Sequence, residues 1–300
     1  MTARAPAKVN LHLSVGPLRA DGYHDLTTVF HAVALYDEVS VEPADELTVR
    51  VTGEGAADVP ADRTNLAACA VELLAAHTGN DPAVTVRIAK TIPVAGGCAG
   101  GSADAAAALV ACDALWGTGL SRQELATLGA RLGSDVPFAL HGGTSLGTGR
   151  GEQLTPVLCQ GSYAWVLALA AGGLSTPAVY AELDRLRESG PVTLAGDTSG
   201  TLAALRRGDA VALGRALSND LQAPALSLRP GLRRLLAAGQ ELGAVGGVVS
   251  GSGPTVALLA HDPTHAAALA AALSAEGVCR TVRVAPGPAA GAHLVPEGST

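Results

Sequence analysis

The sequence predicts an α+β fold of two lobes. Stretches with the period-two alternation of strands are mixed with amphipathic helical stretches, and the two kinds do not follow each other regularly. The 300 residues are 48% hydrophobic, which is enough to bury a large core. A glycine-dense segment, "HGGTSLGTGRGEQLTP" (141–156), is the best candidate for a loop or domain junction. We therefore expect an N-terminal domain at 1–150, a C-terminal domain at 151–286 and a tail at 287–300.

The first half of the chain contains both kinds of element. Alternation predicts strands at 7–15, at 83–93 and, around a turn, within 37–53. Helical patterns lie at 65–79 and 121–133. Gly79 is placed to end the first helix, and Ser121 and Glu124 have the spacing of a capping box at the start of the second.

The second half continues the mixture. Strands are expected at 162–170, at 279–286 and, around a glycine turn, within 246–260. Helices are expected in the regions 176–190, 200–220, 228–243 and 265–277. The last residues are rich in Gly, Pro and Ala, a composition that predicts a frayed tail.

The composition excludes several classes of protein. The chain has 20 Lys and Arg against 27 Asp and Glu, a net charge of −7, so neither a nucleic-acid nor an anionic-membrane surface is expected. Its five cysteines are widely spaced and include no C-x-x-C pair, which disfavours a disulfide framework or a zinc site. There is no signal-peptide pattern, and the longest apolar run (164–171) is too short for a bilayer. We expect a cytoplasmic protein.

One stretch, "IPVAGGCAGGSADAAAALVA" (92–111), places four glycines within six residues directly before an alanine-rich helix. Glycines let the backbone approach a ligand closely, and the first N–H groups of a helix have no partner within the helix. Such a site suits phosphate. The alternative is a tight strand-to-helix turn whose glycines only permit close packing.

Two known phosphate motifs do not fit this loop. The Walker A pattern would require a lysine where Ser102 stands, and no G-x-G pair in the chain has the third glycine of the dinucleotide pattern. Asp104 lies in the first helical turn, where a carboxylate favours the helix dipole but repels phosphate. A magnesium ion between the two would resolve that conflict.

Three segments in order resemble the GHMP kinase family, which includes galactokinase, homoserine kinase and mevalonate kinase. "APAKVNLHL" (5–13), "PVAGGCAGGSADAAAAL" (93–109) and "SGSGPTVAL" (250–258) resemble its first, second and third motifs. The second departs from the family pattern at Ala95, Ala99 and Asp104. Further segments resemble the branch of the family that acts on a cytidine diphosphate derivative: "RADGYHDLTTVF" (19–30), "LGSDVPFAL" (132–140), "GTGRGEQLTP" (147–156) and "LSNDL" (217–221).

The resemblance implies a fold, a reaction and its cofactors. The fold would be an N-terminal lobe like domain 2 of ribosomal protein S5 and a ferredoxin-like C-terminal lobe, with the active cleft between them. The reaction would be phosphorylation of the 2-hydroxyl of 4-diphosphocytidyl-2-C-methyl-D-erythritol by ATP, in the non-mevalonate isoprenoid pathway, by a monomer or weak homodimer. Magnesium would be held mainly by the ATP phosphates. ATP would contact Pro93, Val94, Ala95, Gly96, Gly97, Cys98, Ala99, Gly100, Gly101, Ser102, Ala103 and Asp104.

The resemblance also assigns the catalytic pair. Asp135, in "GSDVPF", would be the base that takes the proton of the hydroxyl, although taken alone it is more often a turn or N-cap residue. Lys8 would lie next to it and stabilise charge, whereas alone it would be read as a solvated lysine. Which of the two accepts the proton stays open.

The remaining expected contacts concern the substrate and the third motif. Asn10 projects from the same strand face as Lys8 and could bind the substrate diol. Tyr23 would stack on the cytosine and His24 would hydrogen-bond it, with Tyr180 as a second aromatic under the base. The loop of Gly251, Ser252 and Gly253 would close the cleft floor near the phosphates, and is otherwise a hairpin turn.

Two alternatives remain at this point. One is another GHMP kinase, which "DGYH" and "GSDVPF" disfavour. The other is a non-catalytic nucleotide- or RNA-binding protein built on the S5-like lobe, which the acidic charge and the Lys8/Asp135 pair disfavour.

Overall fold

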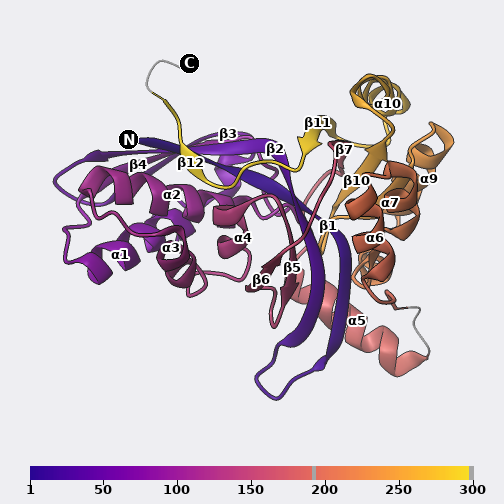
Figure 1. Cartoon of the computed structure of the whole chain (residues 1–300), viewed down its shortest axis with the longest axis horizontal. Coiled ribbons are helices and arrows are strands. Elements are labelled where there is room, and N and C mark those ends of the chain that lie inside the picture. Colours follow the sequence, from indigo (N-terminus) through magenta and orange to yellow (C-terminus); the bar gives the residue numbers. More distant parts are fainter. Residues whose placement is uncertain (191–193, 297–300) are drawn as a thin grey trace.

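The computed structural model describes residues 1–190 and 194–296 and has two lobes, each built on a β-sheet (Figure 1). In the described residues the N-terminal sheet has eight strands. Its main path has the order β12-β1-β2-β4-β3, β5 pairs with β2 and β6, and β8 pairs with β1. The strands are β1 (Thr2–Leu18), β2 (His24–Pro43), β3 (Thr48–Gly53), β4 (Val84–Lys90), β5 (Thr144–Thr148), β6 (Gln153–Pro156), β8 (Ser218–Asn219) and β12 (His293–Leu294).

Helices α1 to α4 lie together on one side of the long strands of this sheet (Figure 1). They are α1 (Leu66–Thr78), α2 (Gly100–Trp116), α3 (Arg122–Gly129) and α4 (Val136–His141), preceded by the short 3₁₀ helix η1 (Ala56–Asp58). Local chemistry sets their ends as expected. The capping box of Ser121 and Glu124 starts α3, and Gly79 ends α1 in the left-handed conformation.

The C-terminal lobe has a four-stranded antiparallel sheet of order β11-β7-β10-β9. Its strands are β7 (Tyr163–Leu169), β9 (Gly246–Val249), β10 (Thr255–Ala260) and β11 (Thr281–Gly287). Its helices are α5 (Thr176–Ser189), α6 (Ser199–Arg207), α7 (Ala210–Ala216), α8 (Gln222–Leu228), α9 (Gly231–Glu241) and α10 (Pro263–Glu276). With helices between β7 and β9 and between β10 and β11, this is the ferredoxin-like order. The predicted α+β, two-lobed fold is confirmed.

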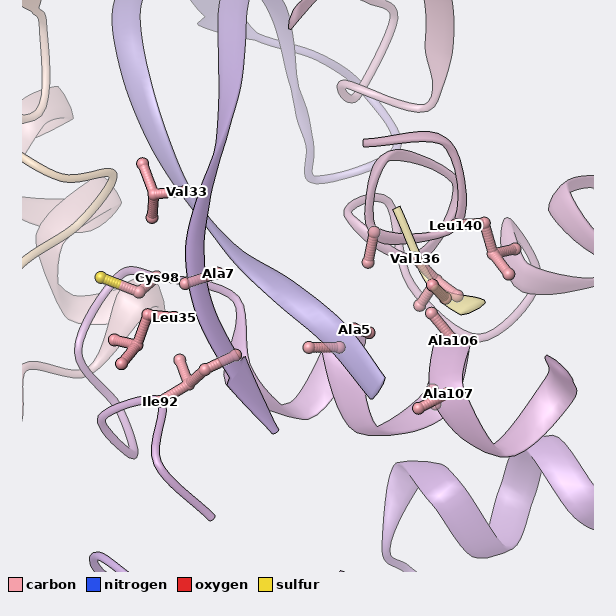
Figure 2. Close-up of a cluster of buried hydrophobic side chains, with 14 of the residues drawn as sticks. Ala5, Ala7, Val33, Leu35, Ile92, Cys98, Ala106, Ala107, Val136 and Leu140 are labelled. Carbon is pink, nitrogen blue, oxygen red and sulfur yellow. The ribbon is translucent and has the colours of Figure 1, made fainter. Parts of the chain in front are cut away.

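The core of the N-terminal lobe is made of small side chains between β1 and α2. In Figure 2, Ala5 on β1 lies close to Ala106 and Ala107 of α2, while Ala7 faces Cys98. All five residues are completely buried. Because alanine adds so little bulk, the helix can lie close against the sheet and still leave no void.

The β1–β2 hairpin joins the two lobes. It extends beyond the N-terminal helices toward α5 (Figure 1), and Leu13 and Val15 near its end belong to the core of the C-terminal lobe. The pairing of β1 with β2 shifts between Asn10 and His12. Such an irregularity changes where side chains on the strand point, and it lies directly after Lys8 and Asn10.

The structure differs from several sequence-based expectations about local structure. The glycine-dense segment 141–156 is mainly the β5–β6 hairpin, and the expected boundary at residue 150 falls in its turn. The tail is not frayed over the part that the structure describes, because β12 pairs with β1 and both Ala289 and Ala292 are buried. Residues 297–300 of the expected tail lie outside the described residues. The region 200–220 also holds β8, and α8 was not expected.

Candidate active site

A cleft of about 500 Å³ lies between the lobes. Its walls come from β1 and β2, the glycine loop before α2, the segment from η1 to the start of α1, the start of α5, and the β9–β10 loop. Segments far apart in the sequence therefore meet at one cavity, which is the usual setting of a small-molecule site.

Lys8 is held within this cleft by polar partners. The residue is 5% exposed, and Nζ donates a hydrogen bond of 2.6 Å to Oδ1 of Asn10. The Asn10 amide donates in turn to Oγ1 of Thr28 at 2.8 Å, and that hydroxyl donates to the carbonyl of His12. This chain of hydrogen bonds along β1 and β2 directs the ammonium toward the cleft instead of solvent.

Asp135 faces the same ammonium from α4. Its Oδ2 lies 4.0 Å from Lys8 Nζ, and its side chain is 32% exposed. Asp135 stands at the N-cap position of α4, but its side chain makes no capping hydrogen bond. The carboxylate is therefore free for another contact, which argues against a purely capping role.

The glycine loop runs over the floor of the cleft in a strained conformation. Ala95 and Ala99, two of the three departures of the second motif from the family pattern, have φ of 51° and 61°. Non-glycine residues rarely adopt this left-handed region. At Gly97 (φ 77°) a Cβ would lie 2.1 Å from the carbonyl oxygen of Ser250, so only glycine fits. The amide of Lys8 donates to the carbonyl of Cys98 at 3.2 Å, which ties the loop to β1.

The structure divides the expected ATP-contacting residues into two groups. Cys98 and Ala103 are completely buried in the core, and neither they nor Ser102 line the cleft. Their positions follow from packing, since Cys98 lies under β1 and Ala103 faces inward from α2. The residues that do line the cleft are Pro93, Val94, Ala95, Gly96, Gly97, Ala99, Gly100, Gly101 and Asp104.

A buried charge cluster that the sequence did not predict lies at the start of α2. Lys90 Nζ bonds to Oδ2 of Asp37 and, at 2.6 Å, to Oδ2 of Asp104. Asp104 thus has a buried lysine as its partner, and the magnesium ion expected beside it stays a prediction. Its Oδ1 is buried without a hydrogen-bond partner in the described residues, and burial raises the pKa of this carboxyl to about 7, with Lys90 opposing the rise and Asp37 adding to it.

The third-motif loop closes the cleft near Lys8. A Cβ added to Gly251 would lie 3.0 Å from Lys8 Nζ, so a larger residue there would crowd the ammonium. Ser252 Oγ lies 2.9 Å from the hydroxyl of Thr176, at the start of α5. Gly253, with φ of 76°, packs beside Val249.

The residues expected to bind the base are only partly brought together. Tyr180 lines the cleft and its ring centroid lies 5.2 Å from that of His24. Burial, with a smaller effect of the Asp135 charge, raises the pKa of Tyr180. His24 Nδ1 lies 3.0 Å from the carbonyl of Gly16 and Nε2 lies 3.3 Å from Oδ2 of Asp184, so both ring nitrogens already have partners.

Tyr23 lies farther out. The residue is 53% exposed, it does not line the cleft, and the guanidinium of Arg150 lies 5.0 Å above its ring. A cytosine that stacks on the Tyr23 ring would therefore lie at the mouth of the cleft.

Sequence reasoning also missed one wall of the cleft. It is formed by Asp58, Val59, Pro60, Thr64, Asn65 and Leu66. The wall adjoins the glycine loop, since a Cβ at Gly101 would lie 3.4 Å from Cδ1 of Leu66. No motif marks it, because most of it is an irregular segment brought in by the fold. The described residues include no group of three or more His, Cys, Asp or Glu that could hold a metal, and no helix among them is long and apolar enough to cross a membrane.

Comparisons with known proteins agree with this architecture. Residues 65–143 match the family model described as GHMP kinases N terminal domain, and residues 201–279 match GHMP kinases C terminal. Two proteins named 4-diphosphocytidyl-2-C-methyl-D-erythritol kinase align along their length. That of Nocardia farcinica (strain IFM 10152) is 60% identical over 97% of this chain and 95% of its own. That of Mycolicibacterium smegmatis (strain ATCC 700084 / mc(2)155) is 58% identical over 100% of this chain and 94% of its own.

A solved structure supports the same grouping. The crystal structure of 4-(cytidine 5'-diphospho)-2C-methyl-D-erythritol kinase superposes with a TM-score of 0.77 at 35% identity, covering 95% of this chain and 98% of that one. Both family models, the full-length relatives and the two-lobed fold agree with the three motifs read from the sequence. The chain therefore belongs to the GHMP kinase family.

Proposed function

We propose that this chain transfers the γ-phosphoryl group of ATP to the 2-hydroxyl of 4-diphosphocytidyl-2-C-methyl-D-erythritol. The observation that carries the proposal is the pair of Lys8 and Asp135, 4.0 Å apart in the cleft beside the glycine loop. The relatives named for this activity align over nearly the whole chain, which supports the choice of substrate.

We place ATP along the glycine loop. Its phosphates fit against Gly96 to Gly101, where the loop meets the positive end of α2, a helix of 17 residues. The unpredicted wall at 58–66 adjoins this loop and lines the same cleft, so we assign the adenine to it. This use of the loop is favoured over a mere tight turn because the glycines face an open cavity.

Asp135 and Lys8 divide the chemistry between them. The oxygen of the substrate hydroxyl forms a bond to the γ-phosphorus, and the bond from that phosphorus to the bridging oxygen breaks and releases ADP. Asp135 accepts the proton of the hydroxyl in the same step. Lys8, fixed by Asn10, orients the carboxylate and offsets the negative charge on the group in transfer. Asp135 suits the base role better than Lys8, because the Lys8 ammonium already donates to Asn10.

The side chains that line the cleft suit a magnesium ion that binds together with ATP. Magnesium sites in phosphoryl-transfer enzymes commonly use one or two carboxylates together with substrate phosphates. Asp135 and the unpartnered Oδ1 of Asp104 offer carboxylate oxygens at the cleft. When bound, the ion would neutralise phosphate charge.

The substrate would lie on the other side of Lys8. Asn10 is placed to contact the tetritol, and Tyr180 forms a wall for the base. Because the two ring nitrogens of His24 are occupied by Gly16 and Asp184, His24 would meet cytosine through its backbone or ring face. Tyr23 would cover the base from the cleft mouth.

The test is a coupled ADP-release assay with a panel of alcohols. The wild type should release ADP rapidly with the cytidine substrate and not with homoserine or mevalonate. Asp135→Asn should lose about 10³-fold or more in kcat and still bind ATP, because an amide cannot accept the proton. Near-normal turnover by Asp135→Asn, or a preference for another alcohol, would contradict the proposal.

A further inference from the structure

The segment "LSNDL" (217–221) has no role in the proposed chemistry, yet it reaches the cleft, because its last residue, Leu221, lines it. Strand β8 within it pairs in parallel with β1, with Ser218 opposite His12 and Asn219 opposite Leu13. Its polar side chains reach different parts of the molecule. Ser218 contacts the His12 ring at 2.9 Å, and Asp220 accepts from the amide of Val15 at 2.8 Å.

Asn219 holds the β9–β10 loop. Its side-chain amide donates to the carbonyls of Val249 and Gly251 at 2.8 and 2.7 Å, and its Oδ1 accepts from the amide of Leu221 at 2.8 Å. Both amide hydrogens of one side chain are thus used on this loop. The loop, in turn, contacts the glycine loop, since Ser250 Oγ donates to the carbonyl of Gly97 at 3.0 Å.

The hold on Gly251 sets the direction of the next amide. In a planar trans peptide the C=O and the following N–H point to opposite sides. Asn219 binds the Gly251 carbonyl and does not line the cleft, whereas Gly251 and Ser252 do. The N–H of Ser252 therefore points to the cleft side. Within 1–190 and 194–296 it has no hydrogen-bond partner.

We propose that Asn219 is a positioning residue that aims the Ser252 N–H at a phosphate oxygen in the cleft. A fixed backbone donor is well suited to such an anion, because its direction costs nothing to set during the reaction. The phosphate belongs either to ATP or to the diphosphate of the cytidine substrate. The inference rests on the proposed function, because both sources are its substrates.

The first test compares Asn219→Ala with Ser218→Ala, a matched control in the same strand that loses only the contact with His12. Asn219→Ala should lower kcat at least 10-fold and leave the KM for the cytidine substrate within about threefold, because Lys8 and Tyr180 stay in place. Ser218→Ala should stay within twofold of wild type in both. A folded Asn219→Ala enzyme with kcat within twofold of wild type overturns the inference, as do equal losses in the two variants.

A second measurement tests the contact of the Ser252 N–H with phosphate in the wild type, so it does not depend on whether Asn219→Ala folds. The ¹⁵N-labelled wild type is titrated separately with a non-hydrolysable ATP analogue plus magnesium and with the cytidine substrate. The Ser252 amide proton should move downfield with one of them, and that one is the source of the phosphate. No shift with either overturns the inference. A wild type that releases no ADP contradicts the proposed function instead, and the titration still tests Ser252.

Discussion

Two lysines line the same cleft and are equally buried, at 5% exposure, but their surroundings differ. Lys90 bonds directly to two carboxylates, Asp37 and Asp104, which are 0% and 2% exposed. Lys8 bonds to the neutral Asn10 and faces one partly exposed carboxylate, Asp135, at 4.0 Å. In the first group the ammonium is bonded to both carboxylates, and among their oxygens only Oδ1 of Asp104 lacks a hydrogen-bond partner in the described residues. The second leaves carboxylate oxygens free for a substrate.

The difference separates a structural use of charge from a chemical one. Removing one member of a buried ion pair leaves an uncompensated charge, so a closed cluster ties its elements together. Asp37 also accepts from the amides of Thr91 and Ile92, which begin the glycine loop, and the other end of that loop is bonded to Lys8. The Asp37–Lys90–Asp104 cluster thus anchors the start of the glycine loop. The Lys8–Asp135 pair lies beside the same loop, where we propose that the phosphoryl group is transferred.

The largest effect is expected at Lys90. Lys90→Met leaves Asp37 and Asp104 facing each other without a cation, so the free energy of unfolding should fall by about 3–5 kcal/mol. Urea unfolding followed by circular dichroism measures it. The triple variant with Asp37→Asn and Asp104→Asn should recover much of the loss. A Lys90→Met protein as stable as wild type would remove the contrast between the two lysines.

Lys8→Met should show the opposite balance. Loss of the ammonium should lower kcat about 10²–10³-fold, the usual cost of one donor to the reacting group. The unfolding free energy should fall much less than in Lys90→Met, because Asn10 keeps its bond to Thr28 and Asp135 can be hydrated. Steady-state kinetics and urea unfolding on the same preparation test both parts. Unchanged kcat would place Lys8 among the structural residues.

Sequence patterns predicted what local chemistry decides. The capping box of α3, the end of α1 at Gly79 and the β9–β10 pair around its glycine turn are set by neighbours in the chain, and the structure confirms them. Lys8 and Asp135 are 127 positions apart, and only the family resemblance brought them together before the structure did. The family assignment is confirmed, whereas the roles of these two residues stay predictions.

Two of the errors share one physical cause, which is that glycine serves close packing as well as loops. Gly147 sits in a strand because a Cβ there would lie 2.8 Å from the ring of Phe30, yet in the sequence it indicated a loop. At Gly291 a Cβ would lie 2.2 Å from the carbonyl of Leu140, so the small residues of the expected tail serve close packing. The Asp37–Lys90–Asp104 cluster was missed because its members come from three elements and have no motif spacing.

The free energy of unfolding should depend on pH through the Asp37–Lys90–Asp104 cluster. Burial raises the pKa of Asp104 to about 7 in the folded protein, against 3.8 ordinarily. The folded state therefore holds the proton more tightly than the unfolded chain, so the resulting stability is full below about pH 4 and is lost as the pH rises toward 7. The slope is at most about 1.4 kcal/mol per pH unit. Asp104→Asn should remove it in urea unfolding between pH 5 and 8, and identical slopes in both proteins would contradict this.

The smallest effect is expected in the loop that joins the two lysines. Ala99 has φ of 61° and ψ of 35°, a left-handed conformation that costs an L-residue about 1–2 kcal/mol and a glycine little. Glycine also gives the unfolded chain more conformational entropy, which offsets part of this gain. Ala99→Gly should therefore raise the free energy of unfolding by about 0.5–1 kcal/mol. The matched control is Ala114→Gly inside α2, which should lower it by about 1 kcal/mol because that position is helical. If both substitutions destabilise equally, Ala99 is not strained. Ala99→Gly could also stabilise the protein and slow phosphoryl transfer. In that case the strained backbone at Ala99 helps to align Lys8, and alanine is needed there.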